Sequence, residues 1–265
     1  MPASFTLLGT SAGPGVPSYF CDCCGCREAR ENPALARTRS GALVRSGDGF
    51  HLIDTPPDLR QQLVNQPLQS ILAIEQIFLT HWHYDHFGGL GELEYYVKLH
   101  RKQPIKLFLP PSAVASFHDA FPDLTDVFDV SAWVFGQSYP LGDCSVTPLP
   151  AAHGIETAGF LITAPDKRLA YFPDTAGLPE FTRQRLGSLD WFFCDATFTG
   201  DNWFPNSHMS IDEAVSLGRD IGAASTVLTH LSIHYSHSMT VRDLQDYLAD
   251  SPDVFIAYDG MEIVL

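Results

Sequence analysis

Four side chains of metal-ligand type lie within six residues, in the run His-Trp-His-Tyr-Asp-His at positions 81–86. The five residues before this run are apolar and β-branched, so we expect the run where a buried strand ends. Side chains two apart share a face of an extended segment, so His81 and His83 can bind one metal ion. After a turn, Asp85 and His86 can bind a second ion. Such ligands suit Zn²⁺, Mn²⁺ or Fe.

Three more residues of ligand type each follow a predicted apolar strand, as His81 does. They are His153, Asp174 and His230. Taken singly, each has an ordinary alternative, since a lone histidine is often structural and an aspartate often forms a turn. Strands that end on one edge of a fold can bring such residues together in one cleft. We therefore predict a two-metal centre, and metal-bound water makes metal-dependent hydrolysis the expected chemistry.

Cysteine usage predicts a second metal site. Four of the six cysteines are Cys21, Cys23, Cys24 and Cys26. In a chain without an export signal, clustered cysteines indicate metal ligands before disulfides. The two remaining cysteines lie in apolar stretches and are expected in the core.

Strand-like and helix-like stretches alternate along the chain without a linker or repeat, so we predict one domain over residues 1–265. Expected strands lie at 5–9, 41–46, 50–54, 76–80, 105–109, 127–135, 144–150, 159–163, 168–172, 191–196, 225–228, 254–258 and 262–265. Expected helices lie at 58–65, 90–101, 112–121, 179–189, 210–221 and 241–248. This pattern fits either two packed sheets with helices outside or one doubly wound sheet. Pattern alone does not separate the two architectures.

Composition limits the partners and the location. The net charge is −15, from 16 basic and 31 acidic residues, which argues against a nucleic-acid partner because such a partner requires a basic surface. No apolar run approaches the roughly 20 residues of a membrane span. The N-terminal residues show no signal-peptide pattern, so a cytoplasmic protein is expected.

The motif His-x-His-x-Asp-His, followed at a distance by His, Asp and His, resembles that of the metallo-β-lactamase superfamily. The resemblance implies an α/β fold, an αββα sandwich of two mixed sheets flanked by helices, and two divalent ions, Mn²⁺ or Zn²⁺ or Fe. It implies that one ion is bound by His81, His83 and His153. It implies that the other is bound by Asp85, His86 and His230, with Asp174 bridging the two. A bridging carboxylate is similar to the phosphodiesterase and glyoxalase branches.

The spacing Cys21-x-Cys23-x-x-Cys26 resembles the structural zinc clip of the PhnP-like cyclic phosphodiesterases of phosphonate catabolism. The clip would lie in an N-terminal loop at about 20–27 and would be closed by a histidine shortly after the last active-site histidine. His234 matches that position, and His237 is the alternative ligand. Three thiolates and one imidazole make a closed, structural zinc site. Cys24 is then the one cysteine of this cluster that is not expected to bind the zinc ion.

The narrower resemblance implies a small phosphorylated substrate, 5-phosphoribosyl 1,2-cyclic phosphate, attacked by a hydroxide held between the two metals. Asp85 would act at the metal centre, and His208 would protonate the leaving oxygen. A structural role for His208 at the start of the following helix is the alternative. Asp54 and Asp259 each end a strand and are expected to support ligands or form turns. Relatives are commonly dimers, so a homodimer is a further expectation.

Other functions stay open on the sequence. A stretch at 58–62, Asp-Leu-Arg-Gln-Gln, and the cysteine clip also resemble the pyrroloquinoline-quinone biosynthesis protein B group, PqqB. The intact motif at 81–86 counts against that group, and the acidic charge counts against a transfer-RNA 3′-end nuclease. Two further alternatives are another ester hydrolase of the same fold and a metal-binding protein without activity. Few Arg or Lys residues lie near the motifs, which weighs against a phosphorylated substrate.

Overall fold

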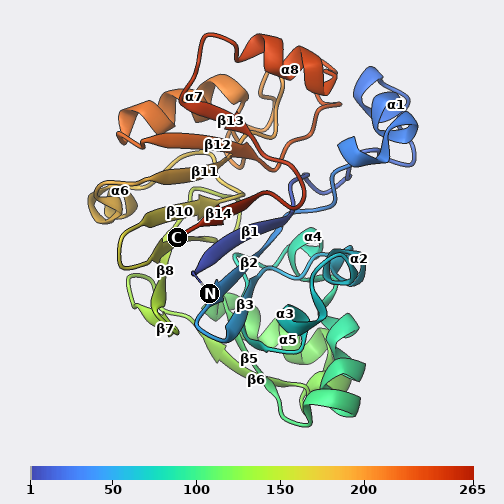
Figure 1. Cartoon of the computed structure of the whole chain (residues 1–265), viewed down its shortest axis with the longest axis vertical. Helices are drawn as coiled ribbons and strands as arrows, with labels where there is room; N and C mark the ends of the chain where they lie inside the picture. Colours follow the sequence, from blue (N-terminus) through green and yellow to red (C-terminus); the bar gives the residue numbers. More distant parts are fainter. Residues whose placement is uncertain (1) are drawn as a thin grey trace.

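Two mixed β-sheets of seven strands pack face to face (Figure 1). The structure, a computed structural model, describes residues 2–265, so Met1 of the predicted domain lies outside the described residues. The first sheet consists of β14 (Glu262–Val264), β1 (Ser4–Gly9), β2 (Gly41–Ser46), β3 (Gly49–Ile53), β4 (Ile74–Phe78), β5 (Ile105–Leu109) and β6 (Phe128–Ala132), in that order. The second consists of β13 (Val254–Ile256), β12 (Ser225–Thr229), β11 (Trp191–Asp195), β10 (Arg168–Phe172), β9 (Ala158–Thr163), β8 (Cys144–Pro150) and β7 (Tyr139–Leu141). The predicted sandwich is confirmed, and the doubly wound sheet is excluded.

Strand direction explains why residues far apart in the sequence meet. In the first sheet β3, β4, β5 and β6 are parallel, and in the second β10, β11, β12 and β13 are parallel. Strand β8 runs in the same direction as β10, because both are antiparallel to β9. The carboxyl ends of β4, β8, β10 and β12 lie along one edge of the sandwich, which we call the rim. Each of these strands is followed there by a predicted ligand residue.

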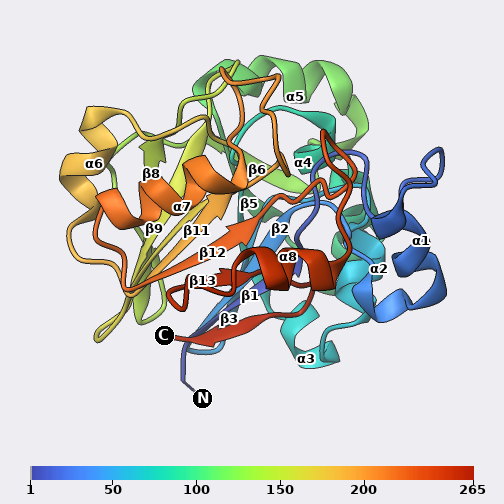
Figure 2. The same cartoon turned by 90° about the horizontal axis from the view of Figure 1, so that it is seen from above.

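Helices cover the outer face of each sheet (Figures 1 and 2). Those over the first sheet are α2 (Leu59–Val64), α3 (Leu68–Ile71), α4 (Tyr84–Phe87), η2 (Leu90–Leu93), η3 (Tyr96–Arg101), η4 (Pro111–Ala113), α5 (Val114–Ala120) and η5 (Pro122–Leu124). The second sheet carries α6 (Glu180–Leu186), α7 (Ile211–Asp220) and α8 (Val241–Tyr247). Helix α1 (Cys24–Glu31) and the turn η1 (Pro33–Leu35) stand apart beside the rim. No helix within residues 2–265 is long and apolar enough to span a membrane.

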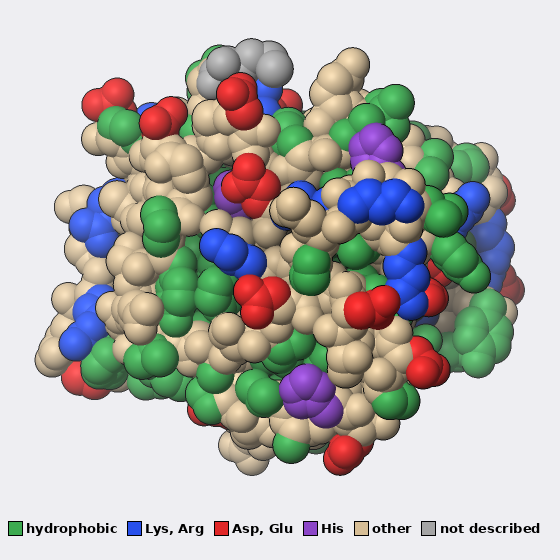
Figure 3. Space-filling view, turned by 90° about the horizontal axis from the view of Figure 1, so that it is seen from below, with side chains coloured by type: hydrophobic (Ala, Val, Ile, Leu, Met, Phe, Trp, Pro, Cys, Tyr) green, Lys and Arg blue, Asp and Glu red, His purple; other side chains and the backbone are tan. Residues whose placement is uncertain are grey.

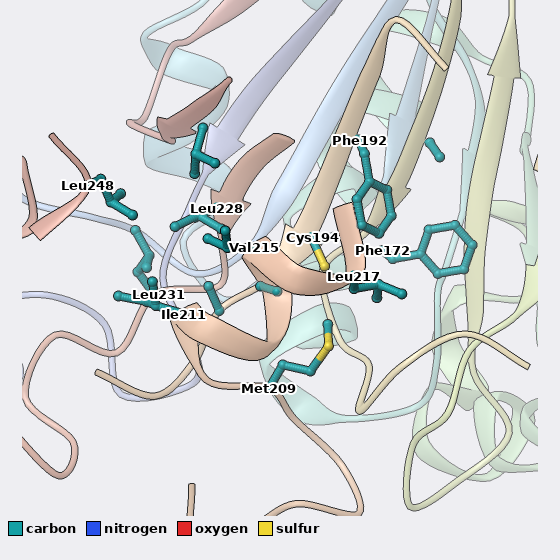
Figure 4. Packing of buried hydrophobic residues seen from close by; sticks show 14 of the residues in the cluster. Phe172, Phe192, Cys194, Met209, Ile211, Val215, Leu217, Leu228, Leu231 and Leu248 are labelled. Carbon is teal, nitrogen blue, oxygen red and sulfur yellow. The ribbon is translucent and has the colours of Figure 1, made fainter. Parts of the chain in front are cut away.

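Three apolar clusters stabilise these layers. Between the sheets, the Phe5 ring lies 5.4 Å from Tyr171 and 4.9 Å from Phe193, which joins β1 to β10 and β11. A second cluster packs the helices onto the outer face of the first sheet. The third lies between the second sheet and α7, where Val215 and Leu217 lie near Phe172 and Leu228 (Figure 4). Basic and acidic side chains are interspersed on the face that Figure 3 shows.

Two local predictions need correction. Residues 90–101 are helical as expected, but the segment passes from the 3-10 turn η2 to the π-helical η3 and is not one regular α-helix. Leu90, Leu93 and Val97 are all buried, so the apolar pattern is satisfied without a continuous α-helix. The cysteine segment, expected as a loop at about 20–27, begins helix α1 at Cys24. Sequence periodicity missed α1 because its buried residues are mostly small.

The contact between β9 and β10 generates a stability prediction. A Cβ atom at Gly159 would lie 2.1 Å from Cδ1 of Phe172, a fully buried ring two residues before Asp174. We expect Gly159→Ala to lower the free energy of unfolding by roughly 1–3 kcal/mol, because the ring must move. Urea denaturation followed by circular dichroism measures this change.

Gly91→Ala is the matched control, because a Cβ atom there would meet no heavy atom within 4 Å. It should leave stability unchanged or raise it slightly, since alanine restricts the unfolded chain. Equal stability of the two variants would contradict the packing that we describe at Gly159.

Candidate metal centre

Seven ligand-type side chains gather at the rim in two groups. In the first group, His83 Nδ1 lies 2.9 Å from His81 Nε2 and 3.3 Å from His153 Nε2. His81 and His83 follow β4, whereas His153 follows β8 in the other sheet. Their three ligand atoms lie within 4.8 Å of one another. The two sheets therefore contribute jointly to the first group.

The second group combines α4 with the end of β12. Asp85 Oδ2 lies 3.8 Å from His86 Nε2 and 4.0 Å from His230 Nε2. These ligand atoms also lie within 4.8 Å of one another. His230 adopts a left-handed backbone conformation, with φ of 54°, at the end of its strand. This conformation is uncommon for a residue other than glycine and is typical of functional sites.

Asp174, after β10, connects the two groups. Its Oδ2 atom lies 2.6 Å from His86 Nε2, 3.2 Å from His230 Nε2 and 3.8 Å from His81 Nε2. The carboxylate is almost completely buried. One carboxylate is thus within reach of both sets of imidazoles. This is the arrangement required for a ligand shared by two cations.

The opposite ring nitrogens of the histidines are held by oxygen atoms of the protein. Each Nδ1 lies 2.8 Å from its partner in the pairs His81–Thr80 Oγ1, His86–Asp54 Oδ2, His153–Ser207 O and His230–Thr197 Oγ1. An Nδ1 that donates its proton leaves the Nε2 lone pair free for a metal. Asp174 Oδ2 faces the buried Nε2 atoms of His86 and His230, and these two atoms have no other hydrogen-bond partner among the described residues. The donor set therefore fits a pair of divalent cations.

Each sheet supplies a buried aspartate that orients these histidines. In the first sheet Asp54 accepts hydrogen bonds from Thr80 N–H at 2.8 Å and Thr80 Oγ1–H at 3.0 Å, and contacts His86 Nδ1. In the second sheet Asp195 accepts from Thr197 N–H at 2.9 Å and Thr197 Oγ1–H at 2.8 Å. Each threonine hydroxyl then faces the Nδ1 of a ligand-type histidine. Asp54 thus supports a ligand-type histidine.

Sequence reasoning missed Asp195, although a signal was present. Asp195 ends the apolar strand β11, in the same way as Asp174 follows β10. The strand expected at 191–196 ran past Asp195 and hid this signal, because Asp174 was selected for lying after its strand. Asp259 lies elsewhere, since it accepts hydrogen bonds at 2.7 Å from Thr10 Oγ1–H, Thr38 N–H and Thr38 Oγ1–H. It joins the loops beneath the rim and belongs to neither ligand group.

The electrostatics of the centre favour cations. Burial alone raises the pKa of Asp174, but His230 and His86 outweigh it and hold that pKa well below the ordinary value. Burial lowers the pKa of His81 and of His230. For His86 the effect of burial is outweighed by Asp54 and Asp174, so its pKa lies well above the usual value. A carboxylate field that attracts protons attracts metal cations at the same atoms.

His208 lies beside the centre and contacts two carboxylates. Its Nδ1 is 2.8 Å from Asp195 Oδ2 and 3.1 Å from Asp174 Oδ1. Burial lowers its pKa, but the hydrogen bonds to Asp174 and Asp195 outweigh burial and raise the pKa to about 10. With Nδ1 held in this way, Nε2 remains available to a bound molecule. The neighbouring capping box of α7, Ser210 with Glu213, is formed without His208.

The four predicted ligands of the zinc clip also lie close together in the structure. Sγ of Cys21, Cys23 and Cys26 and a ring nitrogen of His234 lie within 4.8 Å of one another, and Cys26 Sγ is 3.5 Å from His234 Nδ1. Cys23 caps α1 by accepting the Cys26 N–H at 3.5 Å, and Ser18 N–H donates to Cys26 Sγ at 3.4 Å. Backbone N–H groups at a helix start favour thiolates.

The pKa values of the clip thiols differ. Burial raises the pKa of Cys26 to about 12, whereas hydrogen bonding from the Cys23 backbone lowers that of Cys21. A cation would therefore have to displace the proton of Cys26. Cys24 is not among the clustered thiols, and exposed His237 lies beside Gly200, away from the clip. The structure thus favours His234 over the alternative His237.

A cavity of about 300 Å³ opens onto the centre. Its floor includes His83, Asp85, Asp174, His208 and His230. The remaining lining consists of Ala12, Gly13, Pro14, Thr197, Phe198, Trp203, Phe204 and Tyr235. Among the described lining residues there is neither lysine nor arginine. Sequence reasoning missed this aromatic lining, because the aromatics lie in loops without a periodic pattern.

Comparison with known sequences identifies related proteins. The model of the Beta-lactamase superfamily domain matches residues 51–231. An octanoyltransferase of Porphyromonas gingivalis is 27% identical over 271 residues, which cover 98% of this chain but 51% of that protein. This chain therefore spans about half the length of that relative. The coenzyme PQQ synthesis protein B of Methylorubrum extorquens is 29% identical over 231 residues, covering 74% of this chain and 73% of that protein.

Comparison with solved structures supports the same fold. A diphosphatase from the PhnP family superposes with a TM-score of 0.85 and 24% identity, over 99% of this chain and 98% of that one. A zinc-bound PqqB from Methylobacterium extorquens superposes with a TM-score of 0.80 and 23% identity, over 99% and 100% of the chains. These identities establish a shared fold. Function must be argued from the residues of the site.

The position of Asp174 generates a prediction on metal content. We expect Asp174→Ala to lose at least one of two rim-bound ions and nearly all hydrolysis, because among the described residues Asp174 is the carboxylate that clusters with histidines of both groups. Plasma mass spectrometry after loading with Mn²⁺ and gel filtration measures the ions per chain. Asp166→Ala, which removes an exposed aspartate from a turn, is the control. Two rim-bound ions with full activity in Asp174→Ala would exclude the bridging role.

The clip generates a second prediction, for which Cys24 supplies the control. Cys21→Ser should lose one zinc ion per chain and lower the melting temperature, while the rim centre still binds two ions. Cys24→Ser should change neither property, because its thiol lies outside the cluster. Zinc titration with a chromogenic chelator, together with calorimetry, checks both. Equal zinc content in the two variants would contradict the assignment of Cys21 to the clip.

Proposed function

The chain belongs to the β-lactamase superfamily, and we propose that it is a metal-dependent phosphodiesterase acting on a small cyclic phosphate. The substrate that we propose is 5-phosphoribosyl 1,2-cyclic phosphate, an intermediate of phosphonate catabolism. The observation that carries the proposal is Asp174, whose Oδ2 lies 2.6 Å and 3.8 Å from the Nε2 atoms of His86 and His81. This carboxylate lies within reach of both histidine groups, which would hold the divalent ions that assist phosphoryl transfer.

Two divalent ions at these residues would supply an activated water and would neutralise charge on the phosphoryl oxygens. The protein residues set their geometry. His81, His83 and His153 would hold one ion, and Asp85, His86 and His230 would hold the other. Asp54 and Asp195 fix the histidine rings, the latter through Thr197, so that the Nε2 atoms already point inward before a metal binds. Such preorganisation favours tight binding and a fixed direction of attack.

His208 is the proposed proton donor. Asp195 holds its Nδ1, and its ring lines the cavity, so a proton on Nε2 can pass to the oxygen that leaves phosphorus. An alkoxide is a poor leaving group at neutral pH, so this proton transfer should accelerate the reaction. Asp195 would then act as a positioning residue for His208. The absence of lysine and arginine from the described cavity lining leaves charge neutralisation mainly to the cations.

A second candidate is a PqqB-like role in cofactor biosynthesis, which the 29% identity to PQQ synthesis protein B favours. A PqqB has been crystallised with zinc, so metal binding by itself does not separate the two roles. The phosphodiesterase proposal is preferred for two reasons. A bridging carboxylate is typical of phosphodiesterases, and the diphosphatase of the PhnP family superposes with a TM-score of 0.85, against 0.80 for PqqB.

Phosphorus NMR tests the proposed reaction directly. Metal-loaded protein is expected to convert 5-phosphoribosyl 1,2-cyclic phosphate to a ribose bisphosphate, with a rate that rises when Mn²⁺ is added. The product shows which P–O bond breaks. No conversion by protein that holds its full complement of metal would exclude this substrate. Hydrolysis of other esters by the same preparation would then favour another branch of the superfamily.

The role of His208 is tested by leaving groups of different basicity. His208→Ala should lower kcat about 10²- to 10⁴-fold for a diester that releases an alkoxide, because that oxygen needs a proton. The loss should be much smaller for a p-nitrophenyl diester, whose leaving group needs none. His118→Ala, an exposed histidine on α5, is the control. Equal losses for both substrates would indicate that His208 is structural.

A further inference from the structure

The cavity over the metal centre has two chemically different parts. Its floor carries histidines and carboxylates, whereas four aromatic residues, Phe198, Trp203, Phe204 and Tyr235, form one continuous group in its lining. The Trp203 ring lies 5.0 Å from Phe198, 5.5 Å from Tyr235 and 6.3 Å from Phe204. We call this group the aromatic wall. A phosphoryl group alone would not bind to such an apolar surface.

Two members of the aromatic wall expose apolar surface to water, which is unfavourable. Trp203 is 61% exposed and Phe204 is 53% exposed, whereas Phe198 beneath them is buried. Large aromatic side chains exposed beside a cleft mark binding surfaces, because water contact is unfavourable for them. They offer flat area with few rotatable bonds, so little entropy is lost when a ligand stacks on them.

The loop that carries these rings is held by hydrogen bonds. Asn202 Nδ2–H donates to His208 O at 2.8 Å and to Glu213 Oε2 at 2.9 Å, and Asn202 Oδ1 accepts the Phe204 N–H at 3.0 Å. The His208 N–H donates to Phe204 O at 3.2 Å. The same loop includes Ser207, whose carbonyl faces His153 Nδ1. The loop backbone that carries the exposed rings is therefore held in place relative to the metal centre.

A continuous series of rings links the wall to the reacting position. His230 and His208 stack at 5.3 Å, and His208 lies 6.0 Å from Phe204. A molecule whose phosphoryl group lies at the centre would thus place its adjacent substituent against Phe204 and Trp203. The described lining offers this substituent no lysine or arginine, so the wall disfavours a negatively charged group and suits a flat one.

Resting on the proposed phosphodiesterase activity but not on the ribosyl substrate named there, we propose that the aromatic wall favours, over that substrate, those whose phosphoryl group carries an aromatic or heteroaromatic substituent. Trp203 and Phe204 are the specificity-determining residues. Hydrolysis itself is balanced by water: its oxygen bonds to phosphorus, one ring P–O bond breaks, and a proton reaches the departing oxygen. The wall takes no part in this step and acts by binding the substituent.

A pair of cyclic phosphates that differ only in the substituent tests this inference. These are the five-membered cyclic phosphates of 1-phenylethane-1,2-diol and of propane-1,2-diol, followed by phosphorus NMR with metal-loaded protein. We expect kcat/KM to be about tenfold higher for the phenyl substrate, mainly through KM. Trp203→Ala should abolish most of this preference, and Trp203→Phe should retain part of it. Tyr95→Ala, an exposed aromatic outside the cavity lining, should leave both rates unchanged.

Calorimetric binding of phenylphosphonate and methylphosphonate to the same preparations gives a readout independent of turnover. The phenyl compound should bind about tenfold more tightly, and Trp203→Ala should remove the difference. Equal affinities in the wild type, or a preference that survives in Trp203→Ala, would overturn the inference. Hydrolysis of both substrates without preference would overturn it and leave the proposed function standing. Selective binding without any hydrolysis would instead overturn the proposed function.

Discussion

The buried carboxylate of Asp174 is the group on which the rim depends. An uncompensated charge without solvent is strongly unfavourable, so this carboxylate requires partners that donate hydrogen bonds or carry positive charge. The structure provides imidazoles at 2.6, 3.2 and 3.8 Å, from His86, His230 and His81. These come from the ends of β4 and β12 and from α4. Both sheets must therefore be in place before the charge is compensated, which couples the formation of the centre to the packing of the sandwich.

The same constraint explains the supporting residues. Each imidazole that faces the shared carboxylate through Nε2 needs a hydrogen bond at Nδ1. Without this bond the ring could rotate. Asp54 with Thr80, and Asp195 with Thr197, supply this support from the two sheets in closely similar ways. Asp54 also adopts a left-handed conformation, with φ of 63°. Backbone strain at this position persists because several hydrogen bonds converge on the carboxylate.

The segment after β12 joins three features of the molecule in six residues. His230 belongs to the rim centre, His234 to the cysteine clip and Tyr235 to the aromatic wall. The rings of His234 and Tyr235 lie 5.0 Å apart. The clip thus anchors α1 and the loop before it to the same strand end that presents a ligand-type residue. A structural metal site at this position would stabilise the cavity as well as the N-terminal segment.

The sequence alone determined most of the strands and the ligand-type residues, because each depends on a local pattern. The choice between the two layer architectures came from the resemblance of the metal motif, and strand β7 was not expected. Apolar runs marked β2, β5, β8 and β10 with their observed bounds, and the polar residues that follow such runs marked Asp174 and His230. The spacing of the cysteines likewise marked the clip. Local patterns report burial and strand ends directly, so these features needed no knowledge of distant contacts.

Only the tertiary structure showed which residues orient the ligand-type histidines, which ones line the cavity and which ones lie outside the metal sites. Asp195 and Thr197 acquire a role because β11 lies beside β10 and β12, an adjacency that the sequence does not state. Trp203, Phe204 and Tyr235 form one wall because two loops, after β11 and after β12, fold over the same rim. The structure also decided between the two candidate clip histidines, because His234 and not His237 lies with the three cysteines. These are long-range contacts, and their geometry is set by packing of the two sheets, which local sequence patterns do not encode.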